Sequence, residues 1–74
     1  MQSAQSDWTS DVLAIVRSLN KAEFFLSDVY DGEDKLAKLH PNNHHVRAKI
    51  RQQLQVLRDR DLLEFLGDGH YRLT

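Results

Sequence analysis

The chain has 74 residues, no cysteine, one proline and a formal net charge of −1, from ten lysines and arginines against eleven aspartates and glutamates. A chain of this length forms one small domain and buries only about 60% of its unfolded surface, which leaves little material for a deep catalytic cavity. Without cysteine it has neither disulfides nor thiolate zinc sites, so packing alone must stabilise the fold. A hydrophobic share of 41% with 28% charged residues indicates a globular protein that is neither disordered nor membrane-spanning.

The amino-terminal residues are polar and lack periodicity, so we predict a flexible leader over residues 1–7 and a folded domain over residues 8–74. No basic segment followed by an apolar stretch is visible there, and we expect no secretory signal. Every apolar run is far shorter than a bilayer span, so we expect no membrane partner. These features favour a cytoplasmic protein.

A first helix is predicted from a cap at Thr9 or Ser10 to Asn20. Apolar residues recur through it at helical spacing, and one face is therefore expected to enter the core. These residues are Val12, Leu13, Ile15, Val16 and Leu19. Trp8 lies just before the predicted cap, where it is placed to pack against the first turn.

The second predicted helix follows residues 21–26, which suit a loop or a brief strand. Ser27 or Asp28 caps this helix, and Gly32 is a weak point inside it because glycine disfavours helical backbone. Its apolar contacts come from Val29, Leu36 and Leu39. Pro41 ends the helix, since the residue before a proline is restricted to extended backbone.

A third helix is predicted from a cap at Asn42 or Asn43 to about Arg60. Its apolar positions advance by four, four and three residues, which indicates a continuous core face. These positions are Val46, Ile50, Leu54 and Leu57.

A β-hairpin is predicted after Asp61, which ends the third helix. Residues 62–66 and 70–73 read as strands, and the Gly-Asp-Gly run at residues 67–69 is typical of a tight turn between them. Three helices followed by a hairpin is the element order of a winged helix-turn-helix. We therefore predict an α+β fold, mainly helical, with the hairpin as its wing.

Charge is distributed unevenly along the chain. Residues 1–41 carry four basic groups against seven acidic ones, and residues 61–74 carry one against three. Residues 42–60 carry five basic groups against a single aspartate, a net charge of +4. Such a basic stripe on an acidic body is the pattern expected of a nucleic-acid interface, although most charge runs are only solvated helix faces.

The outward face of the first two turns of the third helix, with its cap, carries residue types that read DNA bases. They are Asn42, Asn43, His44, His45, Arg47, Ala48, Arg51 and Gln52. Asparagine and glutamine bond adenine through N6 and N7, arginine bonds guanine through O6 and N7, and alanine contacts a methyl group. Arginine also binds phosphates, which fix the register of a protein on DNA without reading sequence.

Three histidines near the third helix raise the alternative of a metal site. Pro41 interrupts the helical geometry between His40 and the pair His44 and His45, and a zinc site needs three or four converging ligands. No nucleophile with a base and no catalytic carboxylate pair stands out. We expect a binding module rather than an enzyme, with no metal and no cofactor.

The run at residues 38–59 reads KLHPNNHHVRAKIRQQLQVLRD, and it closely resembles the C-terminal helix-turn-helix domain of Dam-replacing proteins and DpnI-type restriction endonucleases, which cut adenine-methylated GATC. The similarity extends over about residues 19–73, including FFLSDVY at 24–30 and LEFLG at 63–67. The resemblance implies a winged helix that binds double-stranded DNA and reads N6-methyladenine, beside a nuclease domain that is fused or associated.

Two positions depart from the pattern of that family. Asp61 stands where relatives tend to have glycine, and it must therefore adopt left-handed backbone. The wing tip, often basic in relatives, carries Asp68, which would repel phosphate. His70 and Arg72 remain as the wing's candidates for contact with the DNA backbone.

Reading a methylated adenine requires an acceptor for the remaining N6–H and a small apolar wall for the methyl group. Asn42, Asn43 or Gln52 can supply the acceptor, and Pro41 or Ala48 the wall. Two other functions stay open: a winged-helix transcriptional regulator without methyl preference, and a winged helix that contacts protein. No long dimerising helix is evident, so we expect a monomer.

Overall fold

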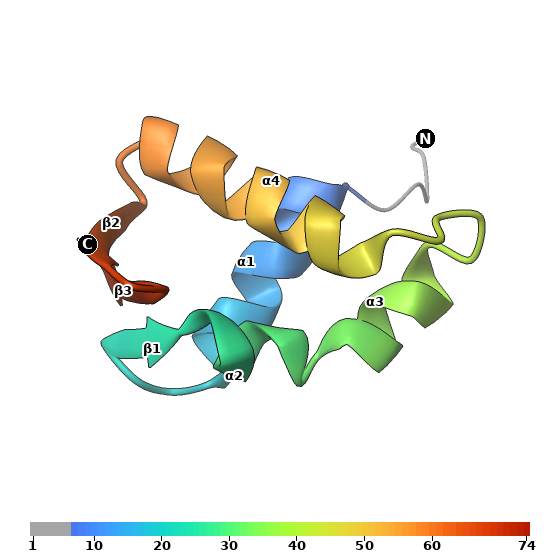
Figure 1. Cartoon of the computed structure of the whole chain (residues 1–74), viewed down its shortest axis with the longest axis horizontal. Helices are drawn as coiled ribbons and strands as arrows, with labels where there is room; N and C mark the ends of the chain where they lie inside the picture. The colour runs from blue at the N-terminus through green and yellow to red at the C-terminus, as the bar shows by residue number, and fades with distance from the viewer. Residues whose placement is uncertain (1–6) are drawn as a thin grey trace, which may run out of the picture.

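The computed structural model describes residues 7–74, which form four helices and a three-stranded antiparallel sheet (Figure 1). The predicted leader therefore lies outside the described residues, apart from Asp7. In chain order the elements are α1 (Trp8–Ser18), β1 (Glu23–Phe25), α2 (Leu26–Tyr30), α3 (Glu33–Leu39), α4 (Val46–Asp59), β2 (Leu63–Gly67) and β3 (His70–Leu73). This arrangement is the predicted winged helix, with α2, α3 and α4 as the helix-turn-helix.

Helix α1 begins two or three residues earlier than the sequence predicts. Asp7, with extended backbone, is the cap, and its Oδ1 accepts a hydrogen bond from the Thr9 N–H at 3.1 Å. Thr9 instead donates from its hydroxyl to Oε1 of Gln53, a mostly buried glutamine on α4. Capping by Thr9 or Ser10 is therefore wrong, because a carboxylate at residue 7 satisfies the free amide. Trp8 is the first helical residue, and it stacks on His40.

The predicted second helix is two helices, separated at Asp31 and Gly32. The break brings Gly32 against α1, where an added Cβ would lie 2.6 Å from Cδ1 of Ile15. Neither Ser27 nor Asp28 is the cap of α2. Asp28 lies inside the helix, and its carboxylate accepts the N–H of Phe25 at 2.8 Å. That backbone hydrogen bond, with the ammonium of Lys21 beside it, lowers the pKa of Asp28.

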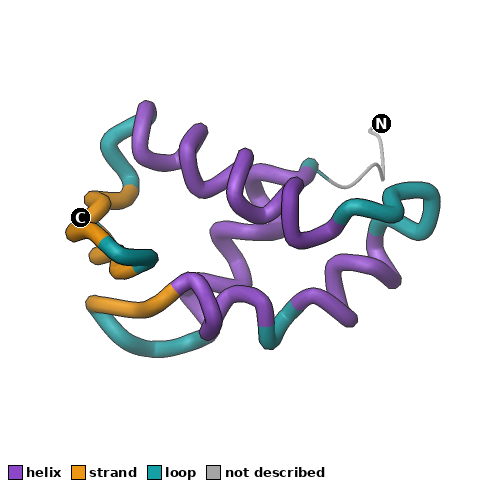
Figure 2. The backbone as a smooth tube through the Cα atoms, in the orientation of Figure 1, coloured by secondary structure: helices purple, strands orange, loops and turns teal. Residues whose placement is uncertain are grey.

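Helix α4 begins at Val46, so the predicted start at Asn42 or Asn43 is wrong. Asn43 closes a turn instead, since its Oδ1 accepts the N–H of His45 at 2.7 Å. At the other end, Asp61 has the predicted left-handed backbone with φ of 61°. Residues 40–45 thus form a six-residue loop between α3 and α4, drawn in teal in Figure 2.

The sheet has the strand order β1-β3-β2. Of the two structures predicted for residues 21–26, a loop or a brief strand, the strand is observed. It is β1, in which Phe24 pairs with Tyr71 of β3. The hairpin prediction is confirmed, and its turn at residues 67–69 has positive φ throughout. The sheet lies at one end of the long axis of the domain, and the loop between α3 and α4 lies at the other (Figure 1).

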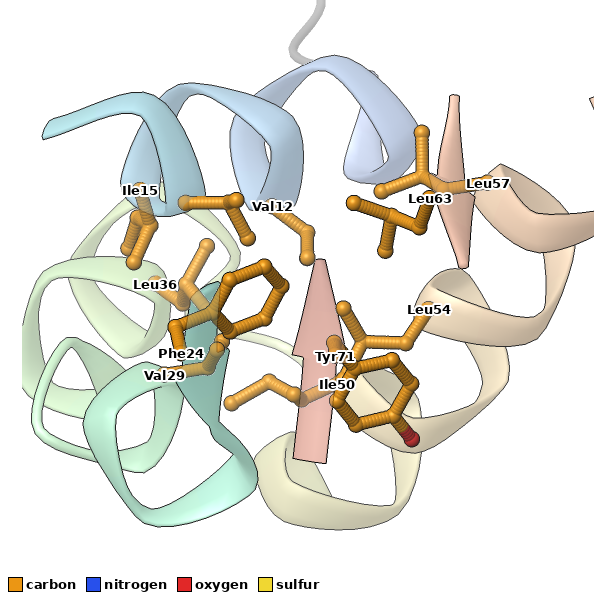
Figure 3. Packing of buried hydrophobic residues seen from close by; sticks show 11 residues of the cluster. Val12, Ile15, Phe24, Val29, Leu36, Ile50, Leu54, Leu57, Leu63 and Tyr71 are labelled. Atoms are coloured by element: carbon orange, nitrogen blue, oxygen red, sulfur yellow. The ribbon is translucent and has the colours of Figure 1, made fainter. Parts of the chain in front are cut away.

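The core lies between α1, α4 and the inner face of the sheet (Figure 3). Ile50, Leu54 and Leu57 of α4 are fully buried, as their spacing predicts, whereas Val46 is half-buried at the start of the helix. The other buried apolar residues are Val12, Ile15, Val16, Phe24, Val29, Leu36, Leu63 and Tyr71. One face of α4 is therefore committed to packing, and the opposite face is presented to solvent.

Candidate nucleic-acid interface

The exposed side of α4 presents four of the predicted contact residues, namely Arg47, Ala48, Arg51 and Gln52. The loop before the helix contributes the exposed residues Pro41, Asn42, His44 and His45, and the half-buried Asn43. The late start of α4 means that the loop residues are carried by irregular backbone rather than by a helical turn. Together these nine residues form a surface that we call the α4 face.

Arg47 makes the best-defined polar contact of the α4 face. Its Nε lies 3.0 Å from Oε2 of Glu33, and its Nη2 lies 2.9 Å from Oε1 of the same carboxylate. This hydrogen-bonded contact lowers the pKa of Glu33 and raises the pKa of Arg47, so both groups stay charged at neutral pH. The Arg47 side chain remains 59% exposed. The Arg47 guanidinium is therefore held by Glu33 through Nε and Nη2, while much of the side chain is exposed to solvent.

Tyr30, at the end of α2, contacts both arginines of the α4 face. The guanidinium carbon of Arg47 lies 4.7 Å from the centroid of its ring, within range of a cation–π interaction. Nη1 of Arg51 donates to the Tyr30 hydroxyl at 2.7 Å. The helix-turn-helix packing therefore brings a tyrosine and a glutamate beside the two arginines.

Neither Glu33 nor Tyr30 was predicted from the sequence to be part of the interface. Their spacing of three residues suggests a shared helical face, but the break at Gly32 and the angle of α3 against α4 decide what that face meets. The excess of positive charge in residues 42–60 pointed to Arg47 and gave no sign of the carboxylate that holds it.

Two adjoining hollows lie on the α4 face. The larger has a volume of about 440 Å³ and extends from Glu33 and Arg47 to residues 43–46 and 48. The smaller, of about 240 Å³, is lined by Asn43, His45, Ala48, Lys49 and Gln52. Ala48 borders both hollows, with amide groups on one side and a guanidinium on the other.

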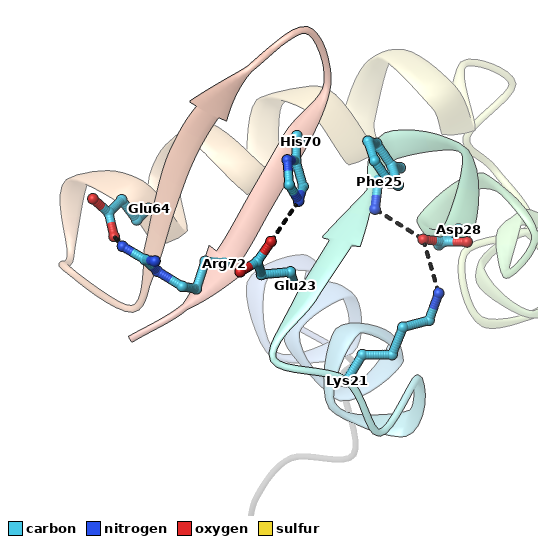
Figure 4. A network of polar contacts seen from close by, with 7 residues as sticks. All are labelled: Lys21, Glu23, Phe25, Asp28, Glu64, His70 and Arg72. Atoms are coloured by element: carbon cyan, nitrogen blue, oxygen red, sulfur yellow. Dashed lines mark hydrogen bonds and ion pairs between the residues drawn. The ribbon is translucent and has the colours of Figure 1, made fainter.

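The wing residues lie apart from the α4 face. His70 and Arg72 alternate along β3 with the buried Tyr71, so they project from the outer side of the sheet (Figure 4). Nε2 of His70 lies 2.9 Å from Oε1 of Glu23, and Arg72 is hydrogen-bonded to Glu64, which raises the pKa of its guanidinium. Both are paired with carboxylates of the sheet, whereas Arg47 is paired with Glu33 of α3.

His40 is separated from the other two histidines of the loop by its contacts. Its Nε2 lies 2.7 Å from Oδ2 of Asp11, and its ring stacks on Trp8 with centroids 3.9 Å apart. These contacts fasten the start of the α3–α4 loop to α1. Within residues 7–74, no three histidine, aspartate or glutamate side chains gather in a way that would hold a metal ion.

Comparison with known protein families shows to which family this chain belongs. Within residues 7–74, no helix is long and apolar enough to cross a bilayer. The model of the family described as the Dam-replacing HTH domain matches residues 4–73. A helix-turn-helix domain of this kind supports DNA as the partner and a non-catalytic role for the module itself. Because the match covers almost the whole chain, the protein belongs to the Dam-replacing HTH domain family.

Proposed function

We propose that this domain binds duplex DNA through the α4 face in the major groove and reads N6-methyladenine within a GATC-like site. It would serve as the specificity module of a methyl-directed restriction system, with cleavage supplied by a fused or associated nuclease domain. The observation that carries the proposal is the surface of α4, where Arg47, Ala48, Arg51 and Gln52 are exposed side by side along two turns.

Charge supports DNA contact at this surface. The segment of residues 42–60 has a net charge of +4, whereas the chain as a whole has −1. Phosphate contact by lysine and arginine supplies most of the sequence-independent affinity for DNA. The residues outside this segment carry five basic groups against ten acidic ones, so the domain is expected to bind random DNA weakly and specific contacts decide where it stays.

Methyl reading is supported by the smaller hollow. Asn43 already uses Oδ1 to accept the N–H of His45. The one N6–H left on a methylated adenine pairs with O4 of thymine, so N7 is the polar group still open on that edge, and Gln52 can donate to it from Nε2. The Cβ of Ala48 supplies an apolar wall beside it. Burial of one methyl group contributes about 0.8 kcal/mol, so two methyl groups in one site favour the methylated duplex by about tenfold.

Replacement of Gln52 by alanine tests the proposal. The wild-type domain is expected to bind a fully methylated GATC duplex about tenfold more tightly than the unmethylated duplex, with the hemimethylated duplex between them. In the Gln52→Ala variant this ratio should fall to about two, because the amide no longer holds the adenine with its methyl group against Ala48. Fluorescence anisotropy with labelled duplexes measures all three affinities.

Gln55 provides the matched control. It is a second exposed glutamine one turn further along α4, where it bonds Asp59 and Arg58. Gln55→Ala should keep the wild-type ratio. Equal affinities of the wild-type domain for the three duplexes would overturn methyl reading, and an unchanged ratio in Gln52→Ala would remove Gln52 from it.

A further inference from the structure

The side-on pairing of Arg47 with Glu33 leaves one edge of the guanidinium free. Arginine has five N–H donors in a rigid plane. Glu33 takes the Nε–H and one hydrogen of Nη2, which form one edge. The two hydrogens of Nη1 and the second hydrogen of Nη2 remain, and they form the end of the fork. This end is the edge that bonds O6 and N7 of guanine in a bidentate contact.

The place of the pair in the fold suits such a contact. Arg47 is the second residue of α4, on the exposed side of its first turn. In helix-turn-helix proteins, the first residues of the second helix are those that reach base edges. Glu33 begins α3, so it holds Arg47 from a separate element rather than from the same helix.

A role in stability alone accounts poorly for the pair. An exposed ion pair contributes at most about 1 kcal/mol to folding, since water screens it and two long side chains lose freedom. A carboxylate close to the DNA surface also repels phosphate. The Glu33 carboxylate therefore lowers the affinity for DNA. It also fixes the plane of the Arg47 guanidinium, and this benefit to recognition offsets the loss.

We propose that Glu33 is a positioning residue that holds the Arg47 guanidinium for bidentate recognition of a guanine in the bound duplex. Tyr30 is the platform of the same arrangement, because its ring lies under Arg47 and its hydroxyl fixes Arg51. The inference rests on the proposed function, in which the site is GATC-like and contains one guanine on each strand. It adds that Arg47 recognises this guanine and that Glu33 orients the Arg47 side chain.

The test compares guanine with 7-deazaguanine in the methylated GATC duplex. The analogue pairs normally but lacks the N7 acceptor, so it removes half of the bidentate contact. For the wild-type domain we expect the substitution to weaken binding by about tenfold. In Glu33→Ala the weakening should shrink to about twofold, with Glu33→Gln between them, since glutamine keeps one acceptor but no charge. Arg47→Ala should remove the effect of the analogue entirely.

Asp34→Ala is the control, because it removes the same charge from the neighbouring exposed residue of α3. It should keep the tenfold difference between the two duplexes. A purely electrostatic role of Glu33 predicts that Glu33→Ala tightens binding to both duplexes equally, and a purely structural role predicts that it weakens both equally. Either result, with the tenfold ratio intact, overturns the proposal.

Failure of this inference is distinguishable from failure of the proposed function. If the wild-type domain prefers methylated DNA but is indifferent to 7-deazaguanine, adenine reading stands and guanine reading by Arg47 falls. If the wild-type domain binds none of the duplexes, both fall together. Thermal unfolding of each variant, followed by circular dichroism, shows whether the fold is retained.

Discussion

Replacing Arg47 and Arg51 together with alanine is expected to weaken binding to a methylated GATC duplex by about a hundredfold. Each good arginine contact to a base contributes about 1–3 kcal/mol, and the two arginines proposed to make such contacts are both exposed on the first two turns of α4. Loss of two cations also lowers the steepness with which affinity falls as salt is raised. Anisotropy titrations at several salt concentrations measure both changes.

The fold should survive this double substitution. The contacts of the two arginines are with Glu33 and Tyr30 at the surface, and exposed contacts of this kind contribute little to stability. Arg17→Ala combined with Arg60→Ala is the matched control, since it removes the same charge from the last turn of α1 and the end of α4. If the control weakens binding as much as the double substitution on the α4 face, net charge rather than that face determines affinity.

Ile50→Ala is expected to have the largest effect on stability while leaving every residue of the α4 face in place. Ile50 is fully buried in the core, and truncation of such a residue costs about 2–5 kcal/mol through lost burial and the cavity that remains. A domain of this size has a free energy of unfolding of only about 4–11 kcal/mol. The substitution should therefore lower the Tm by about 10–30 °C.

Calorimetry or circular dichroism of the variant measures this loss, and Ile50→Val is the graded comparison, with an expected cost of about 1 kcal/mol. Ile50 and Arg51 are adjacent in sequence, but Ile50 is buried and Arg51 is exposed. Substitution of Ile50 should therefore lower the Tm, whereas substitution of Arg51 should lower the affinity for DNA. A Tm of Ile50→Ala close to that of the wild type would contradict the core described above.

Element order and the main core were predictable because they depend on local patterns. The steps of four, four and three residues from Val46 to Leu57 predicted the buried side of α4. The Gly-Asp-Gly run predicted the tight hairpin turn, and its three residues are found to have positive φ. Asp61 was expected in left-handed backbone and has it. Membership of the Dam-replacing HTH domain family agrees with the resemblance carried by residues 38–59.

Helix boundaries were less predictable because several residues can cap, and tertiary contacts choose among them. Asn43 has the side chain of a cap, yet it closes the loop turn to His45. Thr9 has the same capacity, yet its hydroxyl donates to Gln53 across the α1–α4 interface. Both assignments depend on residues far away in sequence or on the loop geometry between helices.

The partners of the candidate contact residues were also beyond reach of the sequence. Charge counting treats Arg47 and Arg72 as equivalent cations, whereas the structure pairs one with Glu33 beside α4 and the other with Glu64 on the outer side of the sheet. Only the packing of α3 against α4 and the strand register bring these carboxylates within reach.

The most direct test of the central claim, that the α4 face binds DNA, is a backbone amide NMR titration of the domain with a methylated GATC duplex. We predict shift changes concentrated in residues 41–52, with further changes at Tyr30 and Glu33 and small ones at His70 and Arg72. Shift changes centred on the outer side of the sheet, with residues 41–52 unmoved, would contradict the claim.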